Sequence, residues 1–168
     1  NLFKSTKNWA NYWKNRKADW KVSYLDNFDH PHRKILVGIL KDLNWLSLME
    51  IGCNAGPNLQ AIVKAIPGRQ VGGIDVNPEA IELAQKSFKG GHFRVGTAED
   101  ILMSDKSTDI VLSDACLIYV GPLKIKKYVR EIKRIGRNYV LLCEFHSTSW
   151  WNRLALKINS GYNAYDWK

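Results

Sequence analysis

Hydrophobic and polar positions follow two alternating periods from about residue 46 onward. Short apolar runs predict strands, and the segments between them repeat apolar residues every three or four positions, which predicts helices. This alternation is typical of βαβ units, so we expect an α/β fold with a parallel sheet covered on both faces. The expected strands are Leu46–Ile51, Gln70–Asp75, His92–Val95, Asp109–Ser113 and Asn138–Phe145.

Several segments between these strands carry helix start and stop signals. Asn77 can cap a helix that has Pro78 at its first position. Gly121 precedes a second helix, which we expect Gly136 to end. After the last strand, Trp150–Ile158 predicts one more helix.

The first 44 residues predict a helical cap in front of the sheet. Pro31–Leu43 has its apolar residues on one side, as a helix that packs on a sheet requires. Further upstream, Trp9, Trp13, Trp20 and Tyr24 predict an aromatic helix or lid with lysines on its other side.

Length and composition fit one domain. The chain has 168 residues, of which 45% are hydrophobic and 24% charged, and this composition excludes a disordered chain. We divide it into a helical lid or cap (1–44), a ligand-binding core (45–146) and a C-terminal helix and tail (147–168). No apolar run approaches the roughly 20 residues that a membrane helix needs, so we expect no membrane span and a cytoplasmic protein.

The net charge of +9 is concentrated in two places. Residues 1–41 hold nine Lys/Arg against three Asp, and residues 124–137 hold seven against Glu131. Two basic patches would suit an anionic partner, but solvated helix faces account for them as well. A nucleic-acid partner is therefore the less favoured alternative.

Cysteine usage excludes a disulfide scaffold. Cys53, Cys116 and Cys143 lie in or beside apolar runs, and their spacing matches no zinc pattern. We expect three buried free thiols. No His, Asp or Glu cluster has the spacing of metal ligands, so we expect no catalytic metal.

The most informative segment runs from Leu48 to Leu59, where an apolar strand enters a tight turn and then a helix. The turn reads Gly52-x-Asn54-x-Gly56-Pro57. A dinucleotide fingerprint requires a third glycine where Pro57 stands, so an NAD-dependent oxidoreductase is a distant alternative. Asn is one of the few residues besides Gly that tolerate a left-handed backbone.

Two acidic residues flank this turn in the expected fold. Glu50 lies just before the turn, and Asp75 ends the next strand, 23 residues after Gly52. A carboxylate at that strand end is placed to accept both hydroxyls of a ribose.

On these residues the chain resembles the class I S-adenosylmethionine-dependent methyltransferases. Their motif, an acid, one residue and then G-x-G-x-G, matches Glu50–Gly56 apart from Asn54. The similarity continues through Gly73–Ala80, through Phe93–Asp100, which is similar to the family's G-D-A-E-D adenine loop, and through the strand Asp109–Ser113. In all it covers about residues 45–146.

The resemblance implies a Rossmann-like, doubly wound sheet of strand order 3-2-1-4-5 in a single methyltransferase domain. The family sheet normally ends in an antiparallel hairpin of two further strands. Only 23 residues follow Phe145, so we expect the chain to be a fragment in which that hairpin is absent.

The resemblance also implies S-adenosylmethionine as the cofactor and S-adenosylhomocysteine as the product. Thr97 stands where the family usually has the Asp that bonds the adenine amino group. The cofactor-binding residues implied for the methionine end, the ribose, the adenine and the floor below the sulfonium are Glu50, Gly52, Cys53, Asn54, Gly56, Asp75, Val76, Thr97, Ala98, Glu99 and Ser113.

The lid adds two candidates. Trp13 and Arg16 can close over the methionine end of the cofactor, with Arg16 pairing with its carboxylate. An aromatic helix that only packs on the sheet is the alternative.

Candidates on the acceptor side follow the carboxyl ends of strands, where open α/β sheets bind their ligands. They are Asp114, Tyr119 and His146. His146 is a candidate general base or a solvated loop histidine. Tyr119 either contacts the acceptor or sulfonium or packs on a helix. The sequence Ser113–Cys116 is not the N/D-P-P-Y/F motif of amino-methylating enzymes.

We therefore expect a methyltransferase that acts on a small-molecule or sugar-like, glycan-type acceptor by in-line displacement. The string G-C-N-x-G-x-N-L is similar to a subgroup associated with surface-sugar biosynthesis, including pseudaminic-acid-associated methylases. An RNA methyltransferase or RNA binder and a non-catalytic cofactor-binding fragment remain as alternatives.

Overall fold

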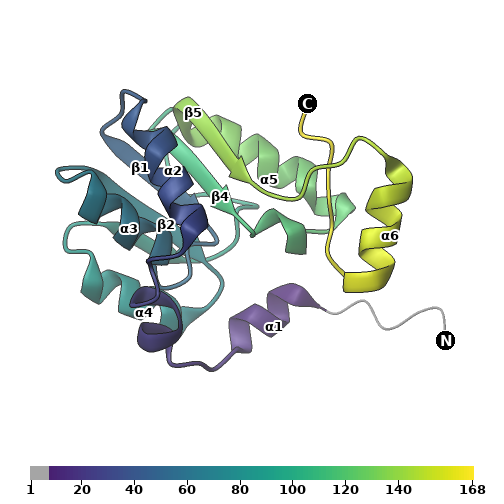
Figure 1. Cartoon of the computed structure of the whole chain (residues 1–168), viewed down its shortest axis with the longest axis horizontal. Coiled ribbons are helices and arrows are strands. Elements are labelled where there is room, and N and C mark those ends of the chain that lie inside the picture. Colours follow the sequence, from purple (N-terminus) through teal and green to yellow (C-terminus); the bar gives the residue numbers. More distant parts are fainter. Residues whose placement is uncertain (1–7) are drawn as a thin grey trace.

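Five parallel strands form one sheet at the centre of the molecule, in the order β3-β2-β1-β4-β5 (Figure 1). The computed structural model describes residues 8–168. All neighbouring strands pair in parallel, which confirms the order expected from the sequence. The strands are β1 (Ser47–Ile51), β2 (Gln70–Asp75), β3 (His92–Val95), β4 (Thr108–Asp114) and β5 (Gly136–Cys143).

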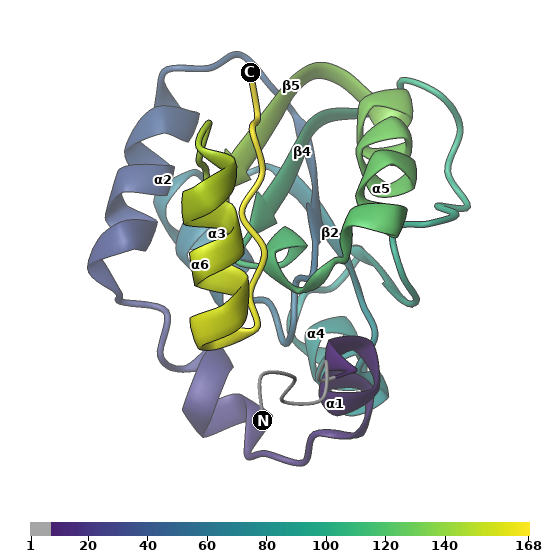
Figure 2. The same ribbon diagram turned by 90° about the vertical axis from the view of Figure 1, so that its right-hand side faces the viewer.

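Helices cover both faces of this sheet. One core cluster joins the sheet to α2 (Pro31–Lys41), α3 (Pro57–Ala65) and α4 (Pro78–Ser87), and a second joins it to α5 (Pro122–Ile135). Figure 2 shows α2 and α3 on one side of the sheet and α5 on the other. The expected cap of α4 is confirmed, because the Asn77 side chain accepts a hydrogen bond from the Ala80 N–H.

The remaining elements lie around the carboxyl edge of the sheet. They are α1 (Trp9–Asn15), the π-helical turn η1 (Lys21–Leu25), the 3₁₀ turn η2 (Leu117–Tyr119) and α6 (Trp150–Ser160). The expected aromatic segment is thus divided, since α1 ends at Asn15 and η1 begins six residues later. No helix among residues 8–168 is long and apolar enough to cross a membrane.

Residues 146–168 form α6 and an extended tail (Figure 1). A single parallel bridge between His146 and Tyr165 ties the tail back to the end of β5. No antiparallel strand pair lies in this segment, all of which the structure describes.

The fifth strand differs most from its prediction. It runs from Gly136 to Cys143, because α5 passes into it directly at Gly136. As an edge strand it is largely exposed, and Cys143 is exposed with it. The prediction of three buried thiols is therefore confirmed for Cys53 and wrong for Cys143, and Cys116 is only half-buried.

Candidate functional site

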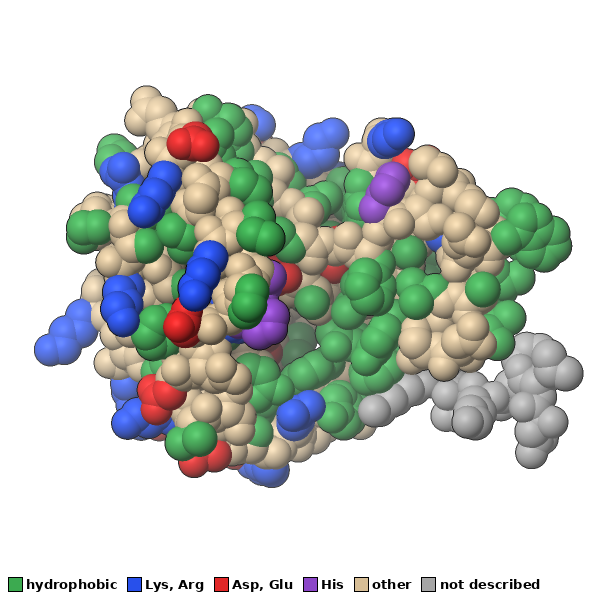
Figure 3. All heavy atoms as spheres, in the orientation of Figure 1, with side chains coloured by type: hydrophobic (Ala, Val, Ile, Leu, Met, Phe, Trp, Pro, Cys, Tyr) green, Lys and Arg blue, Asp and Glu red, His purple; other side chains and the backbone are tan. Residues whose placement is uncertain are grey.

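The candidate site lies where the carboxyl ends of β1, β2 and β4 meet. The strand order reverses between β1 and β4, and open α/β sheets bind ligands at such a switch point. The face seen in Figure 3 is hollowed near its centre, where histidine side chains stand opposite a band of hydrophobic ones.

A left-handed turn after β1 forms one wall. Gly52, Asn54 and Gly56 have φ angles of +75°, +53° and +87°. A Cβ atom on Gly52 would lie 2.5 Å from the sulfur of Cys116, and one on Gly56 would lie 2.6 Å from the ring of Phe88. Glycine is therefore required at both positions, whereas Asn54 adopts the same backbone and its side chain accepts from the Ala55 N–H at 2.7 Å.

Asp75, at the end of β2, is held beside this turn by two backbone groups. Its Oδ2 accepts from the Asn54 N–H and its Oδ1 from the Asn77 N–H, both at 2.9 Å. Burial raises the pKa of Asp75, and these hydrogen bonds counteract it. Each carboxylate oxygen has a further lone pair with which it can accept a ligand hydroxyl.

Glu50, in β1, is a buried acid with one oxygen unpaired. Its Oε1 accepts from Asn58 Nδ2 at 2.6 Å, and its Oε2 has no hydrogen-bond partner in the described part of the chain. Burial raises the pKa of Glu50 to about 8, with smaller contributions from the charges of Asp114 and Asp75. A buried acceptor without a partner is costly, so this oxygen is suited to a cationic or donor group of a ligand.

Asp114, at the end of β4, belongs to the same polar network. Its Oδ2 accepts from Asn58 Nδ2 at 2.9 Å and lies 2.9 Å from His32 Nε2. The Asn58 Oδ1 in turn accepts from Arg33 Nε at 2.7 Å. The beginning of α2 is thereby tied to the ends of β1 and β4. These contacts could not be predicted from the sequence, because they join residues up to 82 positions apart.

Glu144 is a half-buried acid near this edge, and sequence reasoning missed it. Its carboxylate accepts from Ser113 Oγ at 2.7 Å and from three successive backbone N–H groups, those of Cys116, Leu117 and Ile118. It therefore fixes the loop between β4 and η2. An acid inside the apolar run Tyr139–Phe145 was the available signal.

The loop after β3 carries the expected adenine-side residues. Ala98 is buried, while the side chains of Thr97 and Tyr128 share a hydrogen bond. Glu99 forms an ion pair with Lys124 at 2.6 Å. Thr97 and Glu99 thus both contact side chains of α5. Val76, which directly follows β2, is half-buried.

On the opposite side, α1 brings aromatic rings to the carboxyl edge. The Tyr119 ring lies 4.9 Å from Trp9 and 5.5 Å from Trp13 between centroids, and burial raises the pKa of Tyr119 to about 12. The Trp13 Nε1 is buried without a hydrogen-bond partner among the described residues. The Arg16 guanidinium lies 4.9 Å from the centroid of the Trp13 ring and donates to the Tyr12 hydroxyl at 2.9 Å.

His146 lies apart from this network. It is exposed in the segment between β5 and α6, and its Nδ1 accepts from the Trp167 N–H at 3.3 Å. It follows the edge strand β5, whereas Glu50, Asp75 and Asp114 end the three neighbouring strands of the interior. The histidine that contacts Asp114 is His32.

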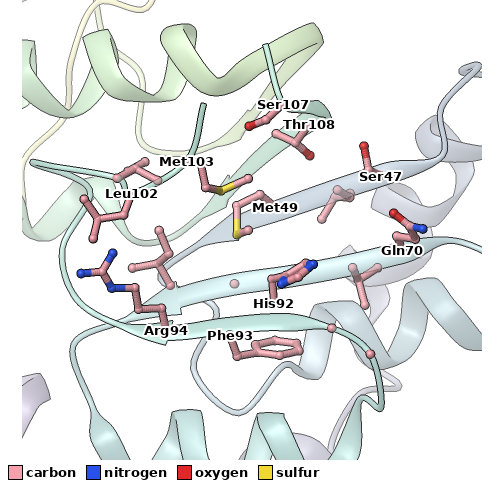
Figure 4. Close-up of a pocket in the computed structure, with 18 of the residues that line it drawn as sticks. Ser47, Met49, Gln70, His92, Phe93, Arg94, Leu102, Met103, Ser107 and Thr108 are labelled. Carbon is pink, nitrogen blue, oxygen red and sulfur yellow. The ribbon is translucent and has the colours of Figure 1, made fainter. Parts of the chain in front are cut away.

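A cavity of about 650 Å³ lies on the sheet face formed by β1, β2 and β3 (Figure 4). Its lining includes Met49, Gln70, His92, Arg94 and Met103, and no candidate cofactor-binding residue. It is therefore separate from the carboxyl-edge site. In the portion from residue 8 onward, no group of three or more His, Cys, Asp or Glu residues could hold a metal ion.

Comparisons with known proteins agree with this geometry. Residues 48–138 match the family described as a methyltransferase domain. The demethylmenaquinone methyltransferase of Thermotoga maritima is 25% identical over 83 residues, 49% of this chain and 36% of that protein. A SAM-dependent methyltransferase from Methanosarcina mazei is 28% identical, with a TM-score of 0.57 over 71% of this chain and 61% of that one. Geranyl diphosphate methyltransferase, solved with GPP and sinefungin, is 13% identical, with a TM-score of 0.67 over 96% of this chain and 76% of that one, and shows the fold alone.

The fold and the family match confirm the resemblance to the class I S-adenosylmethionine-dependent methyltransferases that the sequence motifs indicated. The chain belongs to the methyltransferase domain family, whose match covers more than half of it. It spans about a third of the length of the curated relatives that it matches.

Proposed function

We propose that this chain binds S-adenosylmethionine at the carboxyl edge of its sheet and transfers the methyl group to a small-molecule or sugar-like acceptor. The observation that carries the proposal is the pair of carboxyl groups, Glu50 and Asp75, on either side of the left-handed turn 52–56. Adjacent parallel strands bring the two acids to one edge.

The residues present fit this cofactor. Asp75 has lone pairs free for two ribose hydroxyls, and the turn presents no Cβ at Gly52 or Gly56. The unpaired Glu50 Oε2 suits the ammonium of a methionine moiety, and the unpaired Trp13 Nε1 suits its carboxylate. Glu50 would thus offer a buried acceptor to the ammonium, and Trp13 a buried donor to the carboxylate, of the amino-acid part of the cofactor. The half-buried Val76 and the loop of Thr97, Ala98 and Glu99 would edge the adenine.

Bound S-adenosylmethionine supplies an electrophilic methyl group on a sulfonium. The chain must hold the acceptor in line with that group and exclude water. Trp13 and Tyr119 would exclude water from one side, and Ser113 would line the floor, where Glu144 holds its hydroxyl.

On the acceptor side we assign the proton-accepting role to Asp114 rather than to His146. Asp114 Oδ2 is already engaged by His32 and Asn58, while Oδ1 has no hydrogen bond within residues 8–168. Oδ1 would accept the proton that a hydroxyl or amine acceptor loses as the new bond to carbon forms. The acceptor would therefore be an O–H or N–H donor.

Calorimetric titration with S-adenosylhomocysteine tests the cofactor assignment, with NADH as the control ligand. We expect saturable one-to-one binding of S-adenosylhomocysteine and none of NADH. Transfer of a radiolabelled methyl group to a panel of hydroxyl- and amine-bearing compounds then tests the activity. Absence of S-adenosylhomocysteine binding by the folded protein would refute the proposal.

A nucleic-acid acceptor receives less support. Three cations of the 124–137 patch, Lys124, Arg134 and Arg137, form ion pairs with carboxylates of the chain. RNA binding that weakens steeply with added salt would favour this alternative. We also propose a cytoplasmic location and membership of the subgroup associated with surface-sugar biosynthesis.

A further inference from the structure

The helix α1 is a short element that contacts with the rest of the chain hold in place. It has seven residues, and none of them is buried. An isolated helix of this length is unstable in water, so contacts with the rest of the chain must hold it. At its N-terminal end, Trp9 Nε1 donates to the Gly161 carbonyl at 3.2 Å.

At its C-terminal end, α1 is held by one buried side chain, that of Asn77. The Asn77 Nδ2 donates to the carbonyl of Trp13 at 2.8 Å and to that of Arg16 at 2.9 Å. The last carbonyls of a helix have no partner within it. The Trp13 carbonyl accepts from the Arg16 N–H at 3.3 Å, and Asn77, which is 2% exposed, adds a second donor to it from the core.

The same residue is tied to Asp75 and to α4. Its backbone N–H donates to Asp75 Oδ1, and its Oδ1 accepts from the Ala80 N–H at 3.0 Å. One residue therefore connects the carboxylate proposed for the ribose with the helix that carries Trp13.

We propose that Asn77 is a positioning residue for cofactor binding, which holds α1 so that the unpaired indole N–H of Trp13 faces the methionine end of the site. This inference rests on the proposed function. Asn77 itself touches no ligand atom in this scheme. It acts through α1 on one side and through the Asp75 carboxylate on the other.

Two substitutions separate this role from the helix cap that Asn77 also provides. Asn77→Asp keeps the size and the cap, because an Asp oxygen accepts from the Ala80 N–H equally well. It removes both donors to α1 and sets a carboxylate against two carbonyls. Asn77→Ser also keeps a capping oxygen, adds no charge and is too short to reach α1. Asn8→Asp is the matched control, since Asn8 caps the other end of α1 and an Asp retains that cap.

Affinity for S-adenosylhomocysteine and hydrogen exchange of residues 9–16 are then measured for all four proteins. Both Asn77 variants are expected to bind about tenfold more weakly, in keeping with the loss of two hydrogen bonds. Exchange in residues 9–16 should become faster with and without the ligand, while α3 exchanges as in the parent. Asn8→Asp should bind as the parent does.

Each remaining outcome has a distinct meaning. If the parent fails to bind S-adenosylhomocysteine, the proposed function is refuted. Hydrogen exchange in α1 then still tests whether Asn77 holds this helix. If the parent binds and both Asn77 variants match it in affinity, the inference is wrong while the function stands. If only Asn77→Asp binds weakly, the added charge is the cause and the positioning role is refuted. Unchanged exchange in α1 refutes it as well.

Discussion

The pH dependence of stability should be dominated by Glu50. Burial raises the pKa of this group from its ordinary value of 4.5 to about 8. Between these two values the folded protein keeps a proton that the unfolded chain has released, so stability falls as the pH rises through this range. Each pKa unit corresponds to about 1.4 kcal/mol, which places the loss at about 4 kcal/mol by pH 8.

Glu50→Gln removes this titration. Its amide oxygen can still accept the hydrogen bond that Asn58 donates to Oε1. For a chain of this length, about 4 kcal/mol corresponds to a change of roughly 8–16 °C in Tm. The Tm of the parent should therefore fall by roughly 8–16 °C between pH 5 and pH 8, and the Tm of the variant should fall much less.

Thermal unfolding of the parent and Glu50→Gln at pH 5, 6, 7 and 8 measures this difference. Asp75 and Glu144 also have raised pKa values, but their contributions are common to both proteins. The same substitution should weaken S-adenosylhomocysteine binding about tenfold or more, because an amide, unlike the Glu50 carboxyl group, cannot release a proton to become a charged partner of the ammonium. If both proteins show the same difference in Tm between pH 5 and pH 8, Glu50 does not keep its proton in the folded state, and the reasoning is wrong.

Four further substitutions test the site. Asp75→Ala should weaken S-adenosylhomocysteine binding at least tenfold in calorimetry, because two hydrogen bonds to a charged group are lost; equal affinity would remove Asp75 as the ribose ligand. Trp13→Phe keeps a smaller aromatic ring at this position and removes the unpaired N–H, so affinity should fall several-fold while the ligand-free Tm stays within about 2 °C. A lower Tm at unchanged affinity would assign Trp13 to packing alone. Asp114→Asn should lower the methyl-transfer rate at least a hundredfold and His146→Ala less than twofold; the reverse ranking would restore His146 as the base.

The sheet could be predicted from the sequence because hydrophobic period and turn residues are local signals. The glycine turn and the two acids at strand ends were predictable for the same reason, since β1 and β2 must end at one edge. The contact between His32 and Asp114 was not, because it depends on how α2 crosses the end of β4. His146 lies apart from the other candidates because it follows the edge strand β5. The residues at strand ends, taken by themselves, do not show which strand lies at the edge.

The hydrogen bonds around the glycine turn have a consequence for how tightly and how fast a ligand binds. The N–H groups of Gly52 and Cys53 donate to the Ile74 carbonyl, and that of Asn54 donates to Asp75, so contacts within the chain already fix the turn. Binding then orders little backbone there, and we expect most of the conformational entropy to be lost in α1, a seven-residue helix with no buried residue. Association and release should therefore follow the opening rate of α1, with the turn acting as a rigid template.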